Sequence, residues 1–205
     1  MIILRSQGDG AFCAGASFDE LVAISKEQEG LAFFSGFAQV INAMRKCPKF
    51  ILGRVQGKAV GGGVGLASAT DYCFAHRSAS VKLSELAVGI GPFVVGPAVQ
   101  RKVGLSAMSE LAIDAASWRS AEWAHQKGLF NELFDDHEHM DKALMALAQR
   151  LSRRSPEAMH HLKETFWAQT GHWEDLLSER AAISGELVLS DFTREAIAAF
   201  KSGKR

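Results

Sequence analysis

The sequence predicts an α/β protein with a C-terminal helical region, and three observations carry that prediction. Short apolar runs typical of strands alternate with segments of helical periodicity in the first two thirds of the chain. A glycine-rich turn at residues 57–65 follows one of these runs directly. From residue 155 onward the pattern is helical only. We therefore expect a core at residues 1–150 and a helical region at residues 151–205.

Composition excludes several classes of protein. The 205 residues are 47% hydrophobic and 22% charged, which is typical of a folded globular chain. The 23 basic and 23 acidic residues cancel, so no basic excess indicates a nucleic-acid partner. No apolar run reaches the roughly 18 residues that span a membrane. The start lacks the pattern of a secretory signal, and the three cysteines have no CxxC spacing, so we expect a cytoplasmic protein without disulfides.

The first elements follow from local signals. Residues 2–6 begin with three apolar residues and predict a strand, and we expect that a chain starting inside a strand lacks a preceding segment. Ser17 and Glu20 fit the S-x-x-E capping box that opens a helix. Apolar residues at helical spacing over residues 33–44 predict a longer helix, which Pro48 ends.

The middle of the chain is predicted to contain short strands around the glycine turn. Residues 50–55 are a buried strand, and the turn feeds a helix of small residues that ends near Asp71. Residues 72–75 and 80–83 are two further strands.

Later in the chain, helices dominate. Gly104 and Gly128 are expected to end helices, because glycine favours the left-handed conformation that follows a helix. Residues 129–134 predict one last strand. Ser155 and Pro156 then fit a helix cap and the first helical position.

The glycine turn admits several interpretations. A phosphate-binding P-loop needs Ser or Thr after Gly57 and Lys58, and Ala59 stands there instead. A dinucleotide fingerprint starting at Gly63 lacks its third glycine, although Glu85 lies where a ribose acceptor could stand. The glycines could also serve close packing alone. The interpretation we favour is a turn whose exposed amides receive an anionic oxygen.

A second segment fits the same logic. Residues 11–17 are mostly small and connect the end of a strand to the capped helix. We expect this segment to present another free amide. Two such donors from separate turns that meet at one oxygen would form an oxyanion hole.

Three motifs together resemble the crotonase superfamily of enoyl-CoA hydratases and isomerases. They lie at residues 10–21, at residues 57–66 with Asp71, and at residues 83–92, in the order and spacing of that family. The resemblance implies a spiral of strand-strand-helix turns, an acyl-CoA thioester substrate of the kind used in fatty acid metabolism, and a C-terminal helical region used in a homotrimer or a dimer of trimers. It implies no metal and no cofactor, since coenzyme A is part of the substrate.

The resemblance also implies roles for individual residues. The amides of Ala16 and Gly62 would hold the thioester oxygen, and Glu85 would be the catalytic acid or base. The residues expected to contact substrate are Ala14, Gly15, Ser17, Gly61, Gly63, Gly65, Pro92 and Phe93. Val94 and Val95 are expected to line the acyl chain beside Phe93.

Two departures from the family pattern matter. Many hydratases of the family carry a second glutamate at the position of Gly65, and here that side chain is absent. A single carboxylate can still move a proton between two carbons, which favours double-bond isomerisation over hydration. The family also has an opening strand pair and helix before the segment equivalent to Ile2, and part of the coenzyme A surface is expected there.

Other polar and aromatic residues receive plainer interpretations. The histidine pairs at residues 137–139 and 160–161 lack metal-site spacing and are expected at the surface. The tryptophans are expected in the core or at subunit contacts. Lys201, Lys204 and Arg205 form a basic tail that we interpret as a solvated end. The alternatives to an enzyme of acyl-CoA thioesters are a non-catalytic protein that binds coenzyme A or assembles with partners, and a nucleotide-dependent dehydrogenase.

Overall fold

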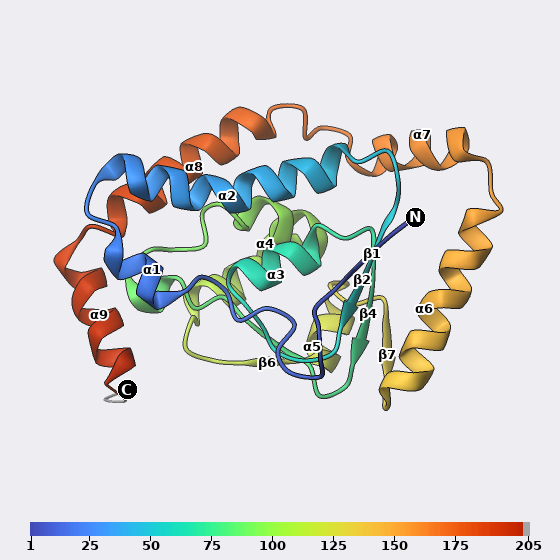
Figure 1. Ribbon diagram of the computed structural model, residues 1–205, viewed down its shortest axis with the longest axis horizontal. Coiled ribbons are helices and arrows are strands. Elements are labelled where there is room, and N and C mark those ends of the chain that lie inside the picture. The colour runs from blue at the N-terminus through green and yellow to red at the C-terminus, as the bar shows by residue number, and fades with distance from the viewer. Residues whose placement is uncertain (203–205) are drawn as a thin grey trace.

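The computed structural model describes residues 1–202, which form two sheets flanked by helices (Figure 1). The larger sheet has the strand order β1-β2-β4-β7 with all neighbours parallel, and the smaller one has the order β3-β5-β6. The strands are β1 (Ile2–Arg5), β2 (Ile51–Val55), β3 (Ala59–Val60), β4 (Tyr72–His76), β5 (Ser80–Lys82), β6 (Arg119–Ser120) and β7 (Glu132–Phe134). In the smaller sheet β5 runs parallel to β3 and antiparallel to β6.

The helices confirm the predicted α/β class with a helical C-terminal region. They are α1 (Phe18–Ala23), α2 (Glu27–Lys46), α3 (Gly62–Ser68), the short η1 (Leu86–Val88), α4 (Gly96–Ile113), α5 (Ala121–Gln126), α6 (His137–Ser152), α7 (Pro156–Phe166), α8 (Trp173–Leu187) and α9 (Asp191–Lys201). Two starts are the predicted ones, because Ser17 accepts from the amide of Glu20 and Ser155 from that of Ala158. The order β2-β3-α3 followed by β4-β5-η1 gives the expected strand-strand-helix units.

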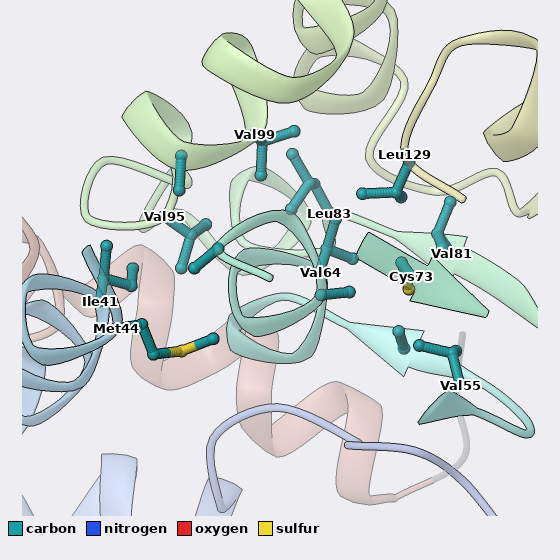
Figure 2. Packing of buried hydrophobic residues seen from close by; sticks show 14 of the residues in the cluster. Ile41, Met44, Val55, Val64, Cys73, Val81, Leu83, Val95, Val99 and Leu129 are labelled. Carbon is teal, nitrogen blue, oxygen red and sulfur yellow. The ribbon is translucent and has the colours of Figure 1, made fainter. Parts of the chain in front are cut away.

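Helix α3 lies at the centre of the molecule and is buried along nearly its whole length. Figure 2 shows Val64 of this helix surrounded by buried side chains from α2, from the strands and from the start of α4. A helix that is covered on all sides must carry small residues if its neighbours are to approach closely, which accounts for its run of glycine and alanine. The central position of α3 fixes the glycine turn that precedes it.

Two expectations about helix and strand ends were wrong. Gly104 has the left-handed conformation expected of a helix end (φ 79°), but the chain resumes a helix at once, so it forms a kink inside α4. The strand expected at residues 129–134 begins only at Glu132. The amides of Leu129 and Phe130 instead bond to the carbonyl of Ala124, closing the turn that follows Gly128. Gly128 itself ends α5 as predicted.

The C-terminal helices return to the core, and α8 lies along α2 (Figure 1). Their backbones meet at Gly30 and Gly185, where a Cβ on Gly30 would lie 2.6 Å from the carbonyl oxygen of Gly185. Farther along the chain, α9 packs against η1 and α1, and Lys201 on α9 forms an ion pair with Asp19 on α1. Lys201 is therefore paired with α1 at the surface, whereas Lys204 and Arg205 lie outside the described residues.

A buried ion pair joins the end of α3 to α7. Asp71 accepts hydrogen bonds from Lys163 Nζ (2.7 Å), the amide of Ile51 (2.7 Å) and Trp167 Nε1 (3.1 Å). The side chains of Asp71 and Lys163 are only 5% and 2% exposed. Both carboxylate oxygens thus have partners, which is the condition under which a charge can be buried.

Candidate active site

The glycine turn between β3 and α3 has a backbone that only glycine adopts readily. Gly61 has φ 51° and ψ −114°, and its amide donates to the carbonyl of Lys82 on β5 (2.9 Å). A Cβ placed on Gly61 would lie 2.9 Å from Oε1 of Glu85. The turn and the carboxyl group of Glu85 are therefore direct neighbours.

The loop at residues 12–17 lies beside this turn. The amides of Phe12 and Cys13 donate to the carbonyl of Lys58 (2.9 and 3.2 Å), and the amide of Val60 donates to the carbonyl of Cys13 (2.9 Å). Gly15 has φ 85° and turns the chain toward α1. The two segments that the sequence suggested as amide donors are thus side by side.

Each segment leaves one amide unused. Within residues 1–202, the N–H of Ala16 has no acceptor, and neither does that of Gly62. Gly62 is the first residue of α3, where a helix supplies no acceptor to its own amides. Both amides belong to residues that line the same cavity, so each can donate to a ligand.

Glu85 stands between β5 and η1 with its carboxyl group inside the protein. Its Oε2 is shielded from solvent and has no hydrogen-bond partner among the described residues. Burial disfavours the charged form and raises the pKa of Glu85 to about 7. A carboxyl group with such a pKa exchanges a proton near neutral pH, as a general acid or base must.

These groups open onto a cavity of about 950 Å³. Of the residues that the sequence placed at the site, eight line it: Ala14, Gly15, Ala16, Gly61, Gly62, Glu85, Pro92 and Phe93. Val94 and Val95 line it as well, and the rest of the wall is mostly apolar. The only charged lining residues in the described part of the chain are Lys82 and Glu85. The cavity can therefore enclose an apolar group beside one carboxyl.

Three residues expected to contact substrate do not line the cavity. Ser17 instead caps α1 through its hydroxyl. Gly63 faces the other loop, where its Cβ would lie 2.5 Å from the carbonyl oxygen of Cys13. Gly65 faces Val95, whose Cγ1 would lie 2.5 Å from such a Cβ. Val95 thus occupies the space that a side chain at position 65 would need.

Several parts of the wall were not predicted from the sequence. Trp118 was expected in the core or at a subunit contact, but it is 42% exposed and lines the cavity. Lys82, the last residue of β5, also lines the cavity, and its place at the end of a short strand gave no signal for this. The helices α2, α8 and α9 add Phe34, Phe37, Ser184, Ala196 and Phe200. Their spacing predicts helices but gives no signal for which distant cavity they reach.

Among residues 1–202, no three His, Cys, Asp or Glu side chains are close enough together to hold a metal ion. In the same part of the chain, no helix has the length and apolar character needed to cross a membrane.

Comparison with known proteins identifies relatives of the same kind. The family model for enoyl-CoA hydratase/isomerase matches residues 1–201. Human mitochondrial methylglutaconyl-CoA hydratase is 32% identical over 166 residues, which cover 79% of this chain and 48% of that protein. Mitochondrial Δ(3,5)-Δ(2,4)-dienoyl-CoA isomerase from Pongo abelii is 33% identical over 136 residues, which cover 62% of this chain and 39% of that protein. The chain thus spans about half or less of the length of these relatives.

Solved structures show the same fold. The crystal structure of enoyl-CoA hydratase from Bacillus halodurans superposes with a TM-score of 0.84 at 20% identity, covering 97% of this chain and 80% of that one. The glycine turn, the loop at residues 12–17 and the match of the family model to residues 1–201 lead to one conclusion. The chain belongs to the enoyl-CoA hydratase/isomerase family.

Proposed function

We propose that this protein acts on acyl-CoA thioesters and moves a double bond within the acyl chain, with Glu85 as the single acid and base. The observation that carries the proposal is the buried carboxyl group of Glu85, whose Oε2 has no hydrogen-bond partner among the described residues and which lies against the glycine turn. The free amides of Ala16 and Gly62 support it as donors to the thioester oxygen.

The chemistry needs both features together. The Glu85 carboxylate takes a proton from the carbon next to the thioester of a 3-enoyl-CoA. The electron pair of the broken C–H bond forms a double bond to the thioester carbon, and the carbonyl π pair moves onto the thioester oxygen, where the amides of Ala16 and Gly62 stabilise the negative charge. One preorganised donor of this kind contributes about 3 to 4 kcal/mol. The protonated Glu85 then returns the proton to the far end of the former double bond, which yields the 2-enoyl-CoA.

The absence of a second carboxylate favours isomerisation over hydration. The addition of water needs one group to orient and activate the water and another to protonate the substrate. In the described part of the cavity wall the only acid is Glu85, and Val95 fills the space beside Gly65. A single carboxyl suffices for a proton that leaves one carbon and returns to another.

The test is to incubate the purified protein with a 3-enoyl-CoA and, separately, with a 2-enoyl-CoA, and to follow the products by chromatography. We expect migration with the first substrate and little hydration of the second. Glu85→Gln should lower turnover by at least about 10²-fold while binding of a saturated thioester stays close to normal. Unchanged turnover of Glu85→Gln would remove this residue from the chemistry. Inactivity on both substrates would favour the non-catalytic alternative.

The homotrimer or dimer of trimers and the cytoplasmic location that the resemblance implies stay predictions. Light scattering of the purified chain would give its subunit number.

A further inference from the structure

The smaller sheet brings two lysines to one tryptophan at the edge of the cavity. Lys58 precedes β3, Lys82 ends β5 and Trp118 precedes β6, so the pairing of the three strands puts them together. The ammonium group of Lys58 lies 4.8 Å from the centroid of the indole ring, and that of Lys82 lies 5.6 Å from it. Lys82 and Trp118 both line the cavity that contains Glu85.

The two ammonium groups beside the ring of Trp118 would be stabilised by a bound anion. The indole attracts each ammonium group, more strongly where the group is desolvated. The two like charges repel each other. Among the described residues neither lysine has an ion pair with a carboxylate, although many other cations of the protein have one. Glu85 is not this anion. Its pKa is raised by burial, and no neighbouring cation within residues 1–202 contributes to the shift.

We propose that Lys82 and Lys58, held on Trp118, form an anion subsite that binds a carboxylate at the far end of the acyl group. The inference rests on the proposed function, since it takes the acyl chain to lie in the cavity. Lys82 is half-buried in a wall that is mostly apolar. A neutral alkyl end beside its ammonium group would therefore desolvate the charge without forming a compensating hydrogen bond. A carboxylate end would instead form charge-assisted hydrogen bonds.

A second source of negative charge is the phosphate of coenzyme A itself, which every substrate would carry. The two sources make different predictions. A subsite for the acyl carboxylate distinguishes between acyl groups, whereas a subsite for phosphate strengthens the binding of all of them and of free coenzyme A.

The experiment measures binding by calorimetry with glutaryl-CoA and pentanoyl-CoA. Both have five acyl carbons, and only glutaryl-CoA carries the terminal carboxylate. Neither has a double bond, so the readout does not depend on turnover. We expect the wild-type protein to bind glutaryl-CoA about tenfold or more tightly than pentanoyl-CoA, a difference of roughly 1.4 kcal/mol. Lys82→Met should remove most of this preference by weakening the binding of glutaryl-CoA, and it should leave the affinity for pentanoyl-CoA equal or slightly higher, since the apolar end no longer desolvates an ammonium group.

Two further variants serve as controls. Lys82→Arg keeps the charge and should keep most of the preference. Lys46→Met removes an exposed lysine of α2 that pairs with Glu174, and it should change neither affinity. Thermal melts confirm that each variant is folded.

The remaining outcomes overturn the proposal in distinguishable ways. Equal wild-type affinity for the two thioesters contradicts the subsite and leaves the proposed function intact. If Lys82→Met weakens both thioesters and free coenzyme A to the same extent, the anion is a phosphate and the acyl-carboxylate assignment is wrong. Failure of both thioesters to bind would contradict the proposed function and this inference together.

Discussion

Two buried carboxyl groups flank helix α3, and they have opposite surroundings. Asp71, just beyond the end of the helix, accepts hydrogen bonds from Lys163, Ile51 and Trp167. Glu85, beside the start of the helix, has an Oε2 with no partner within residues 1–202. Both groups belong to the same small region of the fold, because the helix between them has only seven residues.

The comparison shows that partners, rather than depth, decide what a buried acid does. Asp71 accepts hydrogen bonds from an ammonium group and two N–H donors, so it serves to join α7 to the core. Among the described residues, Glu85 has no cation beside it and only its own backbone amide as a donor, so burial raises its pKa to about 7. Groups with such perturbed pKa values are typical of functional sites.

The largest effect on stability is expected from removal of the buried ion pair between Asp71 and Lys163. Lys163→Met leaves the charge of Asp71 buried without its cation and should lower the free energy of unfolding by about 3–5 kcal/mol, measured by urea denaturation. The double variant Lys163→Met with Asp71→Asn should recover part of this loss, since the orphaned charge is gone. Lys46→Met, which breaks an exposed ion pair with Glu174, should cost less than about 1 kcal/mol. A loss from Lys163→Met no larger than that of this control would contradict the assigned role.

Replacement of Glu85 should have the opposite effect on stability to the loss of Lys163. The pKa of Glu85 is raised from 4.5 to about 7 on folding, so below pH 4.5 both states are protonated and no penalty exists. As the pH rises, the unfolded chain ionises first and the folded state loses stability, by about 3 kcal/mol in total above pH 7. Glu85→Gln should therefore stabilise the protein at about pH 8 and change little at about pH 4. Urea denaturation at both pH values checks this, and equal effects of the substitution at the two would show that Glu85 is not desolvated.

The smallest effect is expected when a second carboxyl group is introduced at Gly65 in α3. Gly65→Glu alone should destabilise the fold, because the new side chain overlaps Val95. With Val95→Ala to make room, we expect a roughly tenfold gain in hydration of a 2-enoyl-CoA, equivalent to about 1.4 kcal/mol. Val95→Ala by itself is the matched control and should give no gain. If the double variant folds but hydrates no faster, the choice between the two reactions is not made at this position.

Much of the fold follows from local signals in the sequence. Ser17 and Ser155 cap helices through side chains that act within four residues, so their patterns suffice. The strands at residues 51–55 and 72–76 are short apolar runs bounded by turns, which have few alternatives. Gly104 shows the limit of such signals, because its conformation was predicted but the resumption of the helix depends on packing after the kink.

The candidate site was predictable where the backbone makes it and not where distant side chains complete it. The amides of Ala16 and Gly62 and the carboxyl of Glu85 came from motifs that resemble a family. Trp118 and Phe200 reach the cavity from residues far along the chain, and no periodicity says which cavity an exposed aromatic will meet. The role of Val95 was also hidden, since only the coordinates bring it against Gly65.

The order of synthesis has a consequence for the wall that α9 contributes. The rings of Phe18 on α1 and Phe200 on α9 meet edge to face with centroids 4.9 Å apart, although nearly the whole chain separates them. A ribosome therefore releases the loop at residues 12–17, the glycine turn and Glu85 well before α9, which contributes to the wall around them. The nascent polypeptide acquires its reactive groups early and encloses them only when α9 docks.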